Sequence, residues 1–327
     1  MPDRGRALVV ISGRARLAGD PGARERLVDE IVGAAHRRGH RDVDVLLAEA
    51  PAVAEAGVRD ATAAGATLVV GVGGDGLLRA VATPLTGSTA VLAIVPSGTG
   101  NNLAAALGIP HVHAAALRVL ADGVVRRIDH GLASWSAASS IRRPGEGADT
   151  ERGVETAAVV SPFLVACGAG LDARMVGGAS AEAKRRFGLA AYLGSALAAA
   201  GDLAPRPTRL VVDGRPIETR SVVVLVANAG HLLPGLVRPR REIVPDDGRL
   251  DVFVVHGGVV GSVRGALELL ASAEPGVGRA GMRLLAEHVL VEVDPPEPVQ
   301  LDGDVMGWSP LLARVAPGAL SVIVPAP

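Results

Sequence analysis

The chain has 327 residues, 49% of them hydrophobic, and this length and composition predict two domains with buried cores. Its 33 Lys and Arg balance 34 Asp and Glu, so the formal net charge of -1 gives no overall attraction to nucleic acid or to anionic lipid. Aromatic residues form 2% of the chain, which argues against a stacking platform for single-stranded nucleic acid.

The first half of the sequence alternates between strand-like and helical patterns. Short apolar runs predict strands that are covered on both faces, as in a parallel sheet, and these are residues 8–11, 43–47, 67–72 and 91–95. The predicted helices are one with the apolar face Leu27, Val28, Ile31 and Val32, which ends at Gly39, and those over residues 53–65, 77–82 and 102–107. This βαβ order predicts an α/β domain over residues 1–131.

The second half is dominated by runs of strand-forming residues. The predicted strands are residues 163–167, 208–212, 221–227, 250–255, 289–293 and 321–324. Asp213-Gly214 lies between two strand-like runs and predicts a two-residue hairpin turn. Helical spacing predicts two helices, marked by Leu189, Leu193 and Leu197 and by Val263, Leu267 and Leu270. We therefore predict a β-rich domain over residues 159–327.

A polar stretch of small residues between Ser134 and Thr156 separates the two halves. It has no periodicity, and it predicts a surface insertion or linker over residues 132–158. The placement of the last segment, residues 311–327, stays open. Its strand-like pattern fits closure of the second domain as well as a return to the first.

Three features bear on the location of the protein. The apolar run that begins at Ala7 is too short for the core of a signal peptide, so we expect a cytoplasmic protein. The most membrane-like stretch, Phe187 to Ala200, falls short of the ~20 apolar residues that span a bilayer, which favours a buried helix. The single cysteine, Cys167, excludes an intramolecular disulfide and a cysteine-based metal site.

Two glycine-rich segments follow predicted buried strands. Gly73-Gly74-Asp75-Gly76 opens a helix, and Pro96 to Asn101 follows the next strand. Each segment alone also fits a structural glycine turn. Such loops direct backbone N–H groups outward, and glycines let phosphate oxygens approach them. Because neighbouring parallel strands end at one edge of a sheet, we expect the two loops to lie together and to bind phosphate.

An ordered set of motifs covers nearly the whole chain. The motifs are Gly73-Gly74-Asp75-Gly76, the segment from Pro96 to Asn101 leading into Leu107-Gly108-Ile109-Pro110, Asp129 before Gly131, Gly168-Ala169-Gly170-Leu171-Asp172-Ala173, Lys184-Arg185-Arg186-Phe187-Gly188 ahead of Ala191-Tyr192, Ala227-Asn228-Ala229-Gly230, Asp247-Gly248-Arg249-Leu250-Asp251 and Leu301-Asp302-Gly303-Asp304. In this order they resemble the catalytic domain of the diacylglycerol kinase family, which includes bacterial lipid kinases and sphingosine kinases.

The resemblance implies a Rossmann-like, NAD kinase-like nucleotide domain followed by a β-sandwich-like domain. It implies ATP-dependent transfer of the γ-phosphoryl group to a lipid hydroxyl in the cleft between them. The acceptor would be diacylglycerol-like or sphingoid-like and would be reached at the membrane surface. By motif position, the residues implied to surround ATP are Gly73, Gly74, Asp75, Gly76, Ser97, Gly98, Thr99 and Asn101.

The resemblance also implies roles for several carboxylates. Asp75 and Asp129 would join an acidic network linked to Mg²⁺, and Asp304 stands where the family usually carries a glutamate proposed as the general base. The residues implied for a structural Mg²⁺, an ion that prefers oxygen ligands, are Asp247 and the backbone carbonyls of Val244 and Arg249. Taken singly, Asp247-Gly248 and Asp302-Gly303 also fit ordinary turns.

Some positions depart from the family pattern. Leu77 replaces a threonine, Asn102 replaces an acidic residue, and Asp304 is one methylene shorter than glutamate. An Asn-Pro pair that normally touches the nucleotide is missing near Ile11-Ser12-Gly13. A misplacement of about 1 Å can cost roughly 100-fold in rate, so a non-catalytic member that binds lipid or nucleotide is the alternative. NAD kinase, which shares a Gly-Gly-Asp-Gly loop and a two-domain plan, is a second alternative.

The remaining features leave their alternatives open. Lys184-Arg185-Arg186 and Arg238-Pro239-Arg240-Arg241 suit either anionic lipid head groups or a solvated face. The eight histidines show no zinc-binding spacing and are assigned no function. Asn228 is predicted either to line the cleft or to end a strand. The sequence fits a homodimer as well as a monomer, and it names no particular lipid.

Overall fold

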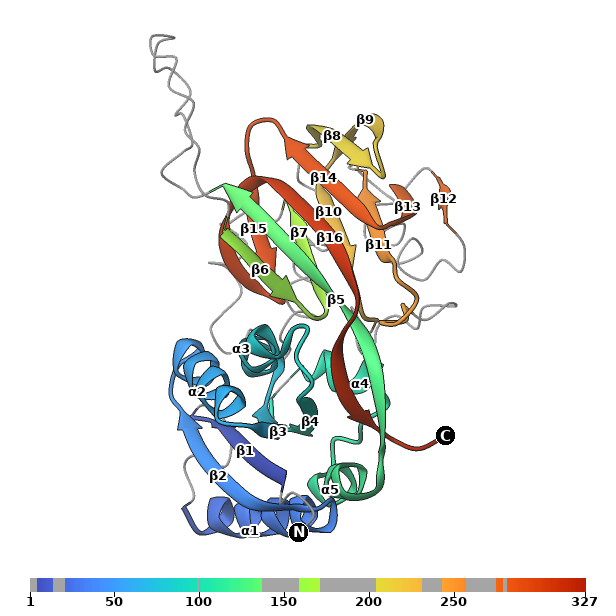
Figure 1. The fold of residues 1–327 in the computed structure, drawn as a ribbon. Helices are drawn as coiled ribbons and strands as arrows, with labels where there is room; N and C mark the ends of the chain where they lie inside the picture. The colour runs from blue at the N-terminus through green and yellow to red at the C-terminus, as the bar shows by residue number, and fades with distance from the viewer. Residues whose placement is uncertain are drawn as a thin grey trace.

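The computed structural model describes residues 5–13, 21–98, 100–136, 159–170, 204–230, 243–256, 275–278 and 281–327 (Figure 1). The elements of the first half are β1 (Gly5–Ser12), α1 (Pro21–Arg37), β2 (His40–Ala48), α2 (Pro51–Ala63), β3 (Ala66–Gly73), α3 (Asp75–Leu85), β4 (Val91–Pro96), α4 (Asn102–Ala106) and α5 (His113–Asp122). Strands and helices alternate here, so the α/β organisation predicted for the first half is confirmed.

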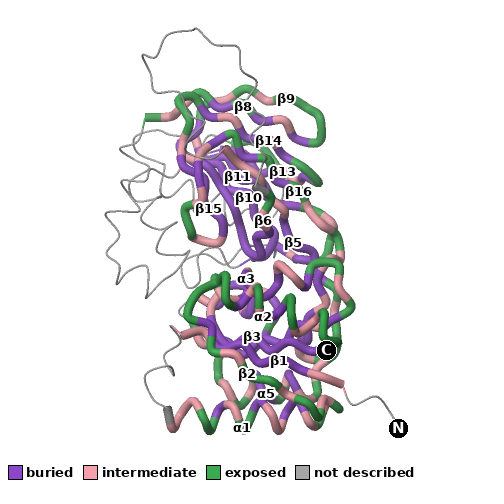
Figure 2. Tube along the Cα trace, turned by 60° about the vertical axis from the view of Figure 1, so that its left-hand side comes forward, coloured by how far each residue is buried: buried purple, intermediate pink, exposed green. Residues whose placement is uncertain are grey.

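Four parallel strands form the sheet of the first half, in the order β4-β3-β1-β2. Successive residues of a strand point to opposite faces of a sheet. Val9 and Ile11 of β1 therefore pack with α1 and α5, whereas Leu8 and Val10 pack with α2 and α3. Helices cover both faces, which explains the purely apolar runs, and Figure 2 shows the centre of this sheet as buried.

The described part of the second half consists of strands. They are β5 (Val124–Ser136), β6 (Val159–Phe163), β7 (Ala166–Ala169), β8 (Arg206–Val212), β9 (Arg215–Ser221), β10 (Val223–Ala227), β11 (Leu250–Val255), β12 (Gly276–Val277), β13 (Gly281–Ala286), β14 (His288–Val293), β15 (Pro298–Leu301) and β16 (Asp304–Val324). Apolar side chains from β7, β10 and β11 meet those from β8, β14 and β16 in one core. The predicted β-rich, sandwich-like second domain is confirmed.

Strand β16 joins the two halves. Its middle pairs with β14 and β5, and its final residues Ser321 and Val322 pair in parallel with Val91 and Leu92 of β4. The end of the chain thus lies beside the first half (Figure 1). Since β5 runs unbroken through residues 131 and 132, the exact domain boundaries stay predictions.

Several element predictions need correction. Residues 163–167 form no single strand, because β6 ends at Phe163 and β7 begins at Ala166. Residues 132–136 belong to β5 rather than to the linker predicted over residues 132–158, and α5 was not predicted. The turn at Asp213-Gly214 is confirmed, with φ of 48° and 79° between β8 and β9. Both predicted second-half helices, including residues 184–192, lie outside the described residues.

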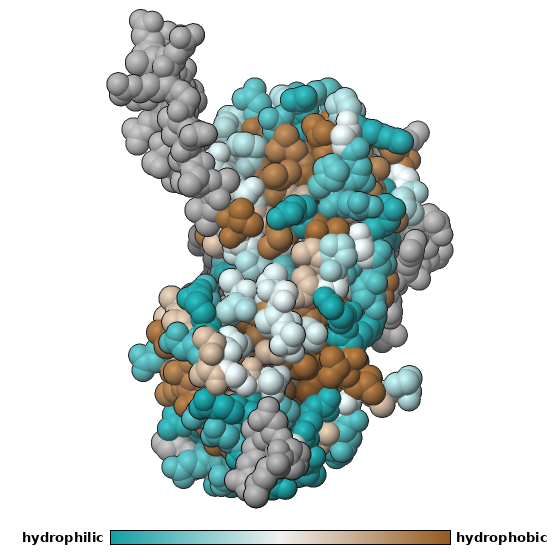
Figure 3. Space-filling model, viewed as in Figure 1, coloured by the Kyte–Doolittle hydropathy of each residue, from teal (hydrophilic) through white to brown (hydrophobic). Residues whose placement is uncertain are grey.

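The described surface mixes polar and apolar side chains. Figure 3 shows brown apolar residues scattered among teal polar ones over both halves. Val160 of β6 and Leu312 of β16 are 58% and 43% exposed, and both pair in register with Ser134 of β5. Within the described ranges, no helix is long and apolar enough to cross a membrane.

Candidate functional site

Strands β3 and β4 end side by side, and the two glycine loops follow them. The backbone N–H of Ser97 donates to the carbonyl of Gly73 at 3.0 Å. A Cβ added to Gly98 would lie 2.4 Å from the Cα of Gly74, so the two backbones touch where no side chain fits. The expectation that the loops lie together is confirmed. Thr99 lies outside the described residues.

The first turn of α3 has room for an anion. This helix has 11 residues, and its N-cap, Gly74, supplies no side chain for the first N–H groups. A Cβ added to Gly76 would meet nothing within 4 Å, so open space borders the first turn. Free N–H groups and the helix dipole both favour a phosphate at such an end. The site therefore fits the phosphates of a nucleotide.

Asp75 ties α3 to the start of α4. Its Oδ1 accepts from the N–H of Leu103 at 3.1 Å, and its Oδ2 accepts from both the N–H and the Nδ2 of Asn102 at 3.1 Å. Burial raises the pKa of the Asp75 carboxyl, and these hydrogen bonds oppose the rise. Asp75 thus fixes the two helices to each other, and a direct role at Mg²⁺ stays a prediction.

The second loop is fastened by side chains on both sides. Asn101 adopts a left-handed backbone with φ of 49°, and its amide bonds both the N–H and the carbonyl of Gly98 at 3.0 and 2.8 Å. His113 Nε2 lies 3.0 Å from Ser97 Oγ, and His111 Nδ1 lies 3.3 Å from Asn101 Nδ2. These two histidines, to which the sequence assigned no function, therefore brace the loop.

Asp129 is buried in β5 and binds the backbone at two glycines, Gly248 before β11 and Gly318 within β16. Its Oδ2 accepts from the N–H of Gly248 at 2.7 Å, and its Oδ1 accepts from the N–H of Gly318 at 2.6 Å. Its own N–H donates to the carbonyl of Pro245 at 2.6 Å. Asp129 thus lies beside the segment of Asp247, whereas Asp75 makes its hydrogen bonds at α4.

The predicted ligands of a structural Mg²⁺ lie in one segment. Asp247 is exposed, and its Oδ1 accepts from the N–H of Arg249 at 3.0 Å, while Val244 lies three residues earlier. One exposed carboxylate with nearby carbonyls suits an oxygen-seeking cation. Among the described residues, no cluster of three or more His, Cys, Asp or Glu is placed to hold a metal. The Mg²⁺ site stays a prediction.

Asp302 fixes the backbone between β6 and β7. Its carboxylate accepts from the N–H groups of Leu164, Val165 and Ala166 at 2.9, 2.9 and 3.1 Å. Burial raises the pKa of Asp302 to about 6, while these bonds and Arg79 oppose the rise. The sequence predicted a turn at Asp302-Gly303, and the structure adds this clamp, for which spacing alone held no signal.

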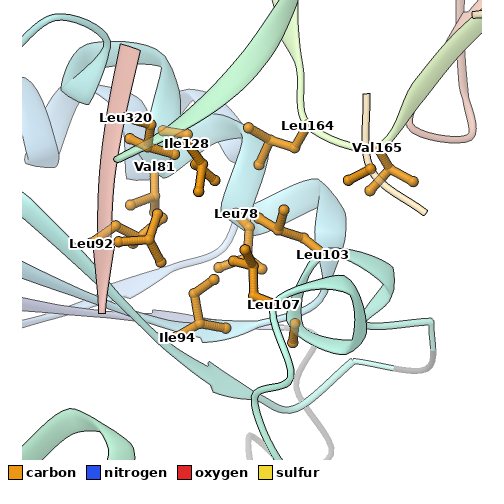
Figure 4. Close-up of a cluster of buried hydrophobic side chains, with 14 of the residues drawn as sticks. Leu78, Val81, Leu92, Ile94, Leu103, Leu107, Ile128, Leu164, Val165 and Leu320 are labelled. Atoms are coloured by element: carbon orange, nitrogen blue, oxygen red, sulfur yellow. The ribbon is translucent and has the colours of Figure 1, made fainter. Parts of the chain in front are cut away.

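The clamped segment packs onto the helices that follow the glycine loops. Figure 4 shows the side chains of Leu164 and Val165 in one buried cluster with Leu78 of α3 and Leu103 of α4. This apolar contact therefore joins the β-sandwich of the second half to the α/β domain of the first half.

A second link between the halves is ionic. Arg79 of α3 donates from Nη2 to Asp304 Oδ2 at 2.7 Å and from Nη1 to the carbonyl of Leu301 at 3.3 Å. Arg79 follows Asp75 by four residues, so both lie on one side of the helix. Arg79 was not among the site residues predicted from the sequence, although its spacing of four residues from Asp75 could have indicated it. Helix α3 thus connects the first glycine loop with the turn that carries Asp304.

Two family models match the chain. The diacylglycerol kinase catalytic domain matches residues 15–133, and the YegS C-terminal NAD kinase beta sandwich-like domain matches residues 165–324. A protein of Pseudomonas aeruginosa strain UCBPP-PA14, named a probable lipid kinase YegS-like, is 30% identical over 332 residues, which cover 99% of this chain and 96% of that protein. The chain belongs to the diacylglycerol kinase catalytic-domain family. The resemblance seen in the sequence motifs is confirmed.

One further relative and two crystal structures are also similar to the chain. The uncharacterized protein sll0036 of Synechocystis is 23% identical over 265 residues, a match that covers 80% of this chain and 55% of that protein. The crystal structure of a diacylglycerol kinase from Bacillus anthracis superposes with a TM-score of 0.68 at 19% identity, covering 99% of this chain and 98% of that one. A second crystal structure from B. anthracis reaches a TM-score of 0.74 at 21% identity, over 98% and 95% of the two chains. At these identities the structures show the shared fold.

Proposed function

We propose that this diacylglycerol kinase family member is an ATP-dependent kinase that phosphorylates a hydroxyl of a diacylglycerol-like or sphingoid-like lipid. The observation that carries the proposal is helix α3, whose N-terminus lies at the glycine loops and whose Arg79 pairs with Asp304 of the sandwich. Phosphoryl transfer needs positioning, neutralisation of charge and a base more than it needs covalent chemistry. Helix α3 links the glycine loops, which would position the phosphates, with Arg79, which would neutralise charge, and with Asp304, which would act as the base.

In the proposed reaction, backbone N–H groups near Gly76 and Gly98 bind the phosphates of ATP. Mg²⁺ bound with ATP would neutralise phosphate charge. Asp304 takes the proton of the lipid hydroxyl, and the hydroxyl oxygen forms a bond to the γ-phosphorus. The bond from that phosphorus to the bridging oxygen breaks, and ADP leaves with its electron pair. Arg79 orients the carboxylate of Asp304 and brings a positive charge toward the transferred group.

The other carboxylates would organise the site. Asp75 holds α4, and with it the second glycine loop, in place beside α3. Asp129 and Asp247 support a structural Mg²⁺, because Asp129 binds the N–H of Gly248, the residue that follows Asp247. We assign Asp75 and Asp129 to the acidic network around ATP and Mg²⁺, and Asp247 with the carbonyls of Val244 and Arg249 to the structural ion.

A lipid acceptor would be met at a membrane surface, so we propose peripheral association from the cytoplasm. The exposed side chains of Val160 and Leu312 on the outer face of the sandwich support such a contact. The basic clusters Lys184-Arg185-Arg186 and Arg238-Pro239-Arg240-Arg241 lie outside the described residues. Their part in membrane binding stays a sequence-based prediction.

A non-catalytic role in binding lipid or nucleotide is the second candidate. It is favoured by the short side chain of Asp304, whose carboxylate is already paired with Arg79. Leu77 adds to it, because its Cδ2 would lie 2.7 Å from a Cβ on Gly73, so an apolar side chain covers the loop where the family has threonine. Lengthening the carboxylate in Asp304→Glu should raise turnover in a kinase and change nothing in a binding protein.

The proposal is tested by incubating the purified protein with γ-labelled ATP, Mg²⁺, a bacterial lipid extract and NAD, and then separating organic from aqueous products. We expect label in a lipid and none in a phosphorylated NAD. Asp75→Asn, which replaces one of the two carboxylate oxygens that accept from the α4 amides with an NH2 donor, should lose the labelled lipid. Label in NADP would establish the NAD kinase alternative. No label in either product, with ATP still bound, would favour the binding protein.

A further inference from the structure

Gln300 in β15 carries a buried amide that is only half satisfied. Its side chain is 1% exposed, and its Oε1 accepts from the N–H of Gly303 at 2.9 Å. That bond identifies which end of the amide is oxygen, because an N–H can only donate. The Nε2 group has no hydrogen-bond partner among the residues that the structure describes.

Folding alone does not explain this donor. A buried polar group without a partner costs free energy, and an apolar side chain of similar size would avoid that cost. Leu225 and Phe253, which lie on the same face of the sheet as Gln300, are apolar and buried, so this face tolerates such residues. An amide at position 300 despite its cost indicates a partner outside the described residues.

The free donor lies above bare backbone. Gln300 pairs with Gly168 of β7, and a Cβ added to Gly168 would lie 3.5 Å from Nε2 and 2.5 Å from the carbonyl oxygen of Val224. No side chain therefore fits at 168, and the neighbours of Nε2 on this side are backbone atoms of β7 and β10. Across the sheet, Gly168 pairs with Leu225 of β10, and Leu225 pairs with Phe253 of β11. Gln300, Gly168, Leu225 and Phe253 thus form one row, in which Leu225 and Phe253 are apolar. A donor thus stands at one end of an apolar row.

The donor is coupled to the proposed reacting centre. The other end of the same amide, Gln300 Oε1, accepts from the N–H of Gly303, which lies in the turn between Asp302 and Asp304. Asp304 would accept the proton of the lipid hydroxyl, and Arg79 holds both Asp304 and the carbonyl of Leu301. A molecule whose hydroxyl reaches Asp304 would place its next few atoms near the strand that carries Gln300.

We propose that Gln300 Nε2 donates a hydrogen bond to an oxygen of the lipid acceptor close to the hydroxyl that is phosphorylated, and so selects acceptors that carry such a second oxygen. The inference rests on the proposed lipid kinase function. A lipid alcohol without a second oxygen, such as a prenol, leaves the donor unpaired and binds more weakly.

The test compares wild type with Gln300→Met and Gln300→Glu on three pure acceptors: dioctanoylglycerol and sphingosine, which carry a second polar group, and farnesol, which has one oxygen. Gln300→Glu keeps an oxygen for the N–H of Gly303, so it separates the donor from the turn. We expect both variants to raise the KM for a two-oxygen acceptor about tenfold, the size of one lost hydrogen bond. The KM for ATP should stay unchanged in both variants, and the rate with farnesol should stay unchanged in Gln300→Glu, which keeps an acceptor for the N–H of Gly303.

Equal changes for all three acceptors in Gln300→Glu, no change for any acceptor in either variant, or a wild type that prefers farnesol would overturn the inference. Lipid binding is measured separately, as the increase in the midpoint temperature of unfolding that dioctanoylglycerol or sphingosine micelles cause. A rise with wild type that both variants lose, without phosphorylation of any lipid, would reject the kinase but keep the Gln300 contact. No rise and no phosphorylation would overturn both proposals.

Discussion

The guanidinium of Arg79 donates to the carboxylate of Asp304 at 2.7 Å, from a helix of the nucleotide-type domain to a turn of the sandwich. Arg79 is 12% exposed, and Asp304 is 61% exposed. The cation is therefore held in place while the carboxylate faces solvent. A pair of this kind contributes at most about 1 kcal/mol to folding, so its importance lies in geometry rather than in stability.

Removing the Arg79 cation should impair transfer and spare ATP binding. In Arg79→Met an unbranched side chain remains, but the charge and the bond to Asp304 are lost. We expect kcat for lipid phosphorylation to fall about 100-fold, as for other groups that stabilise transition-state charge. Steady-state kinetics and equilibrium ATP binding measure the two effects. The control is Arg59→Met, which removes an exposed pair with Glu55 on α2. Equal kinetics in both variants would contradict the role of Arg79.

The contact between the glycine loops predicts a severe effect of Gly98→Ala. The added Cβ would lie 2.4 Å from the Cα of Gly74 and 2.9 Å from the Oδ1 of Asn101, so one loop must move. We expect a loss of about 1 to 3 kcal/mol in folding stability together with loss of ATP binding. Gly33→Ala on α1 is the matched control, because its nearest new contact is 3.9 Å away. Denaturant unfolding compares the two, and equal stabilities would count against the loop contact.

Gly76→Ala should separate binding from folding. A Cβ at this position meets no atom of the described residues outside its own helix turn within 4 Å, so folding stability should stay within about 0.5 kcal/mol of wild type. The same methyl would occupy the space that we assign to a phosphate, so ATP affinity should fall at least tenfold. Calorimetric titration with ATP checks the affinity. Unchanged affinity would place the phosphates elsewhere.

Asp302 makes folding stability depend on pH. Its pKa rises from 3.8 to about 6 on folding, so between these values the folded protein binds more protons than the unfolded chain. The stability contributed by this group is present below pH 3.8 and is lost as pH rises through about 6, by about 1 to 3 kcal/mol. Asp302→Asn should flatten this part of the profile. The exposed control Asp304→Asn should keep it, and equal slopes in both variants would refute the assignment.

The sandwich contains a buried ion pair that should matter far more than exposed ones. Arg283 contacts Asp251 Oδ1 at 2.6 Å with both side chains almost fully buried, and it stacks over the ring of Phe253. Arg283→Met leaves the carboxylate buried and should cost about 3 to 5 kcal/mol. Arg209→Met removes an exposed pair with Glu292 and should cost under about 1 kcal/mol. Chemical denaturation measures both, and a small loss for Arg283→Met would contradict the difference.

Local pattern predicted the first half well. The apolar runs of β1 and β3 and the glycine loops after β3 and β4 are encoded within short windows, and parallel strands bring such loops to one edge. Helix α5 was missed although His113 to Asp122 can form a helix, because its first turn has no side-chain cap to mark it. The end of β16 could not be placed, since its pairing with β4 joins residues more than 200 positions apart.

The parts of the candidate site that lie within one contiguous segment could be predicted from the sequence. The contacts between segments that are distant in the sequence could not. Motif order predicted Asp75 and Asp304 as site residues, but no spacing shows that Asp75 binds the amides of α4 or that Arg79 reaches Asp304. The clamp of Asp302 on residues 164–166 likewise depends on two strands that meet only in the fold. Such contacts follow from tertiary packing, which a single sequence does not reveal.

The central claim is that Asp304, held by Arg79, acts as the base in phosphoryl transfer to a lipid. The most direct measurement is the single-turnover rate of labelled γ-phosphate transfer from ATP to a lipid extract, for wild type and Asp304→Asn at equal ATP occupancy. The account predicts a labelled lipid with wild type and a rate at least about 100-fold lower with Asp304→Asn, because a positioned base contributes 10²–10⁴-fold. Equal rates in the two proteins, or no labelled lipid from an ATP-loaded wild type, would contradict it.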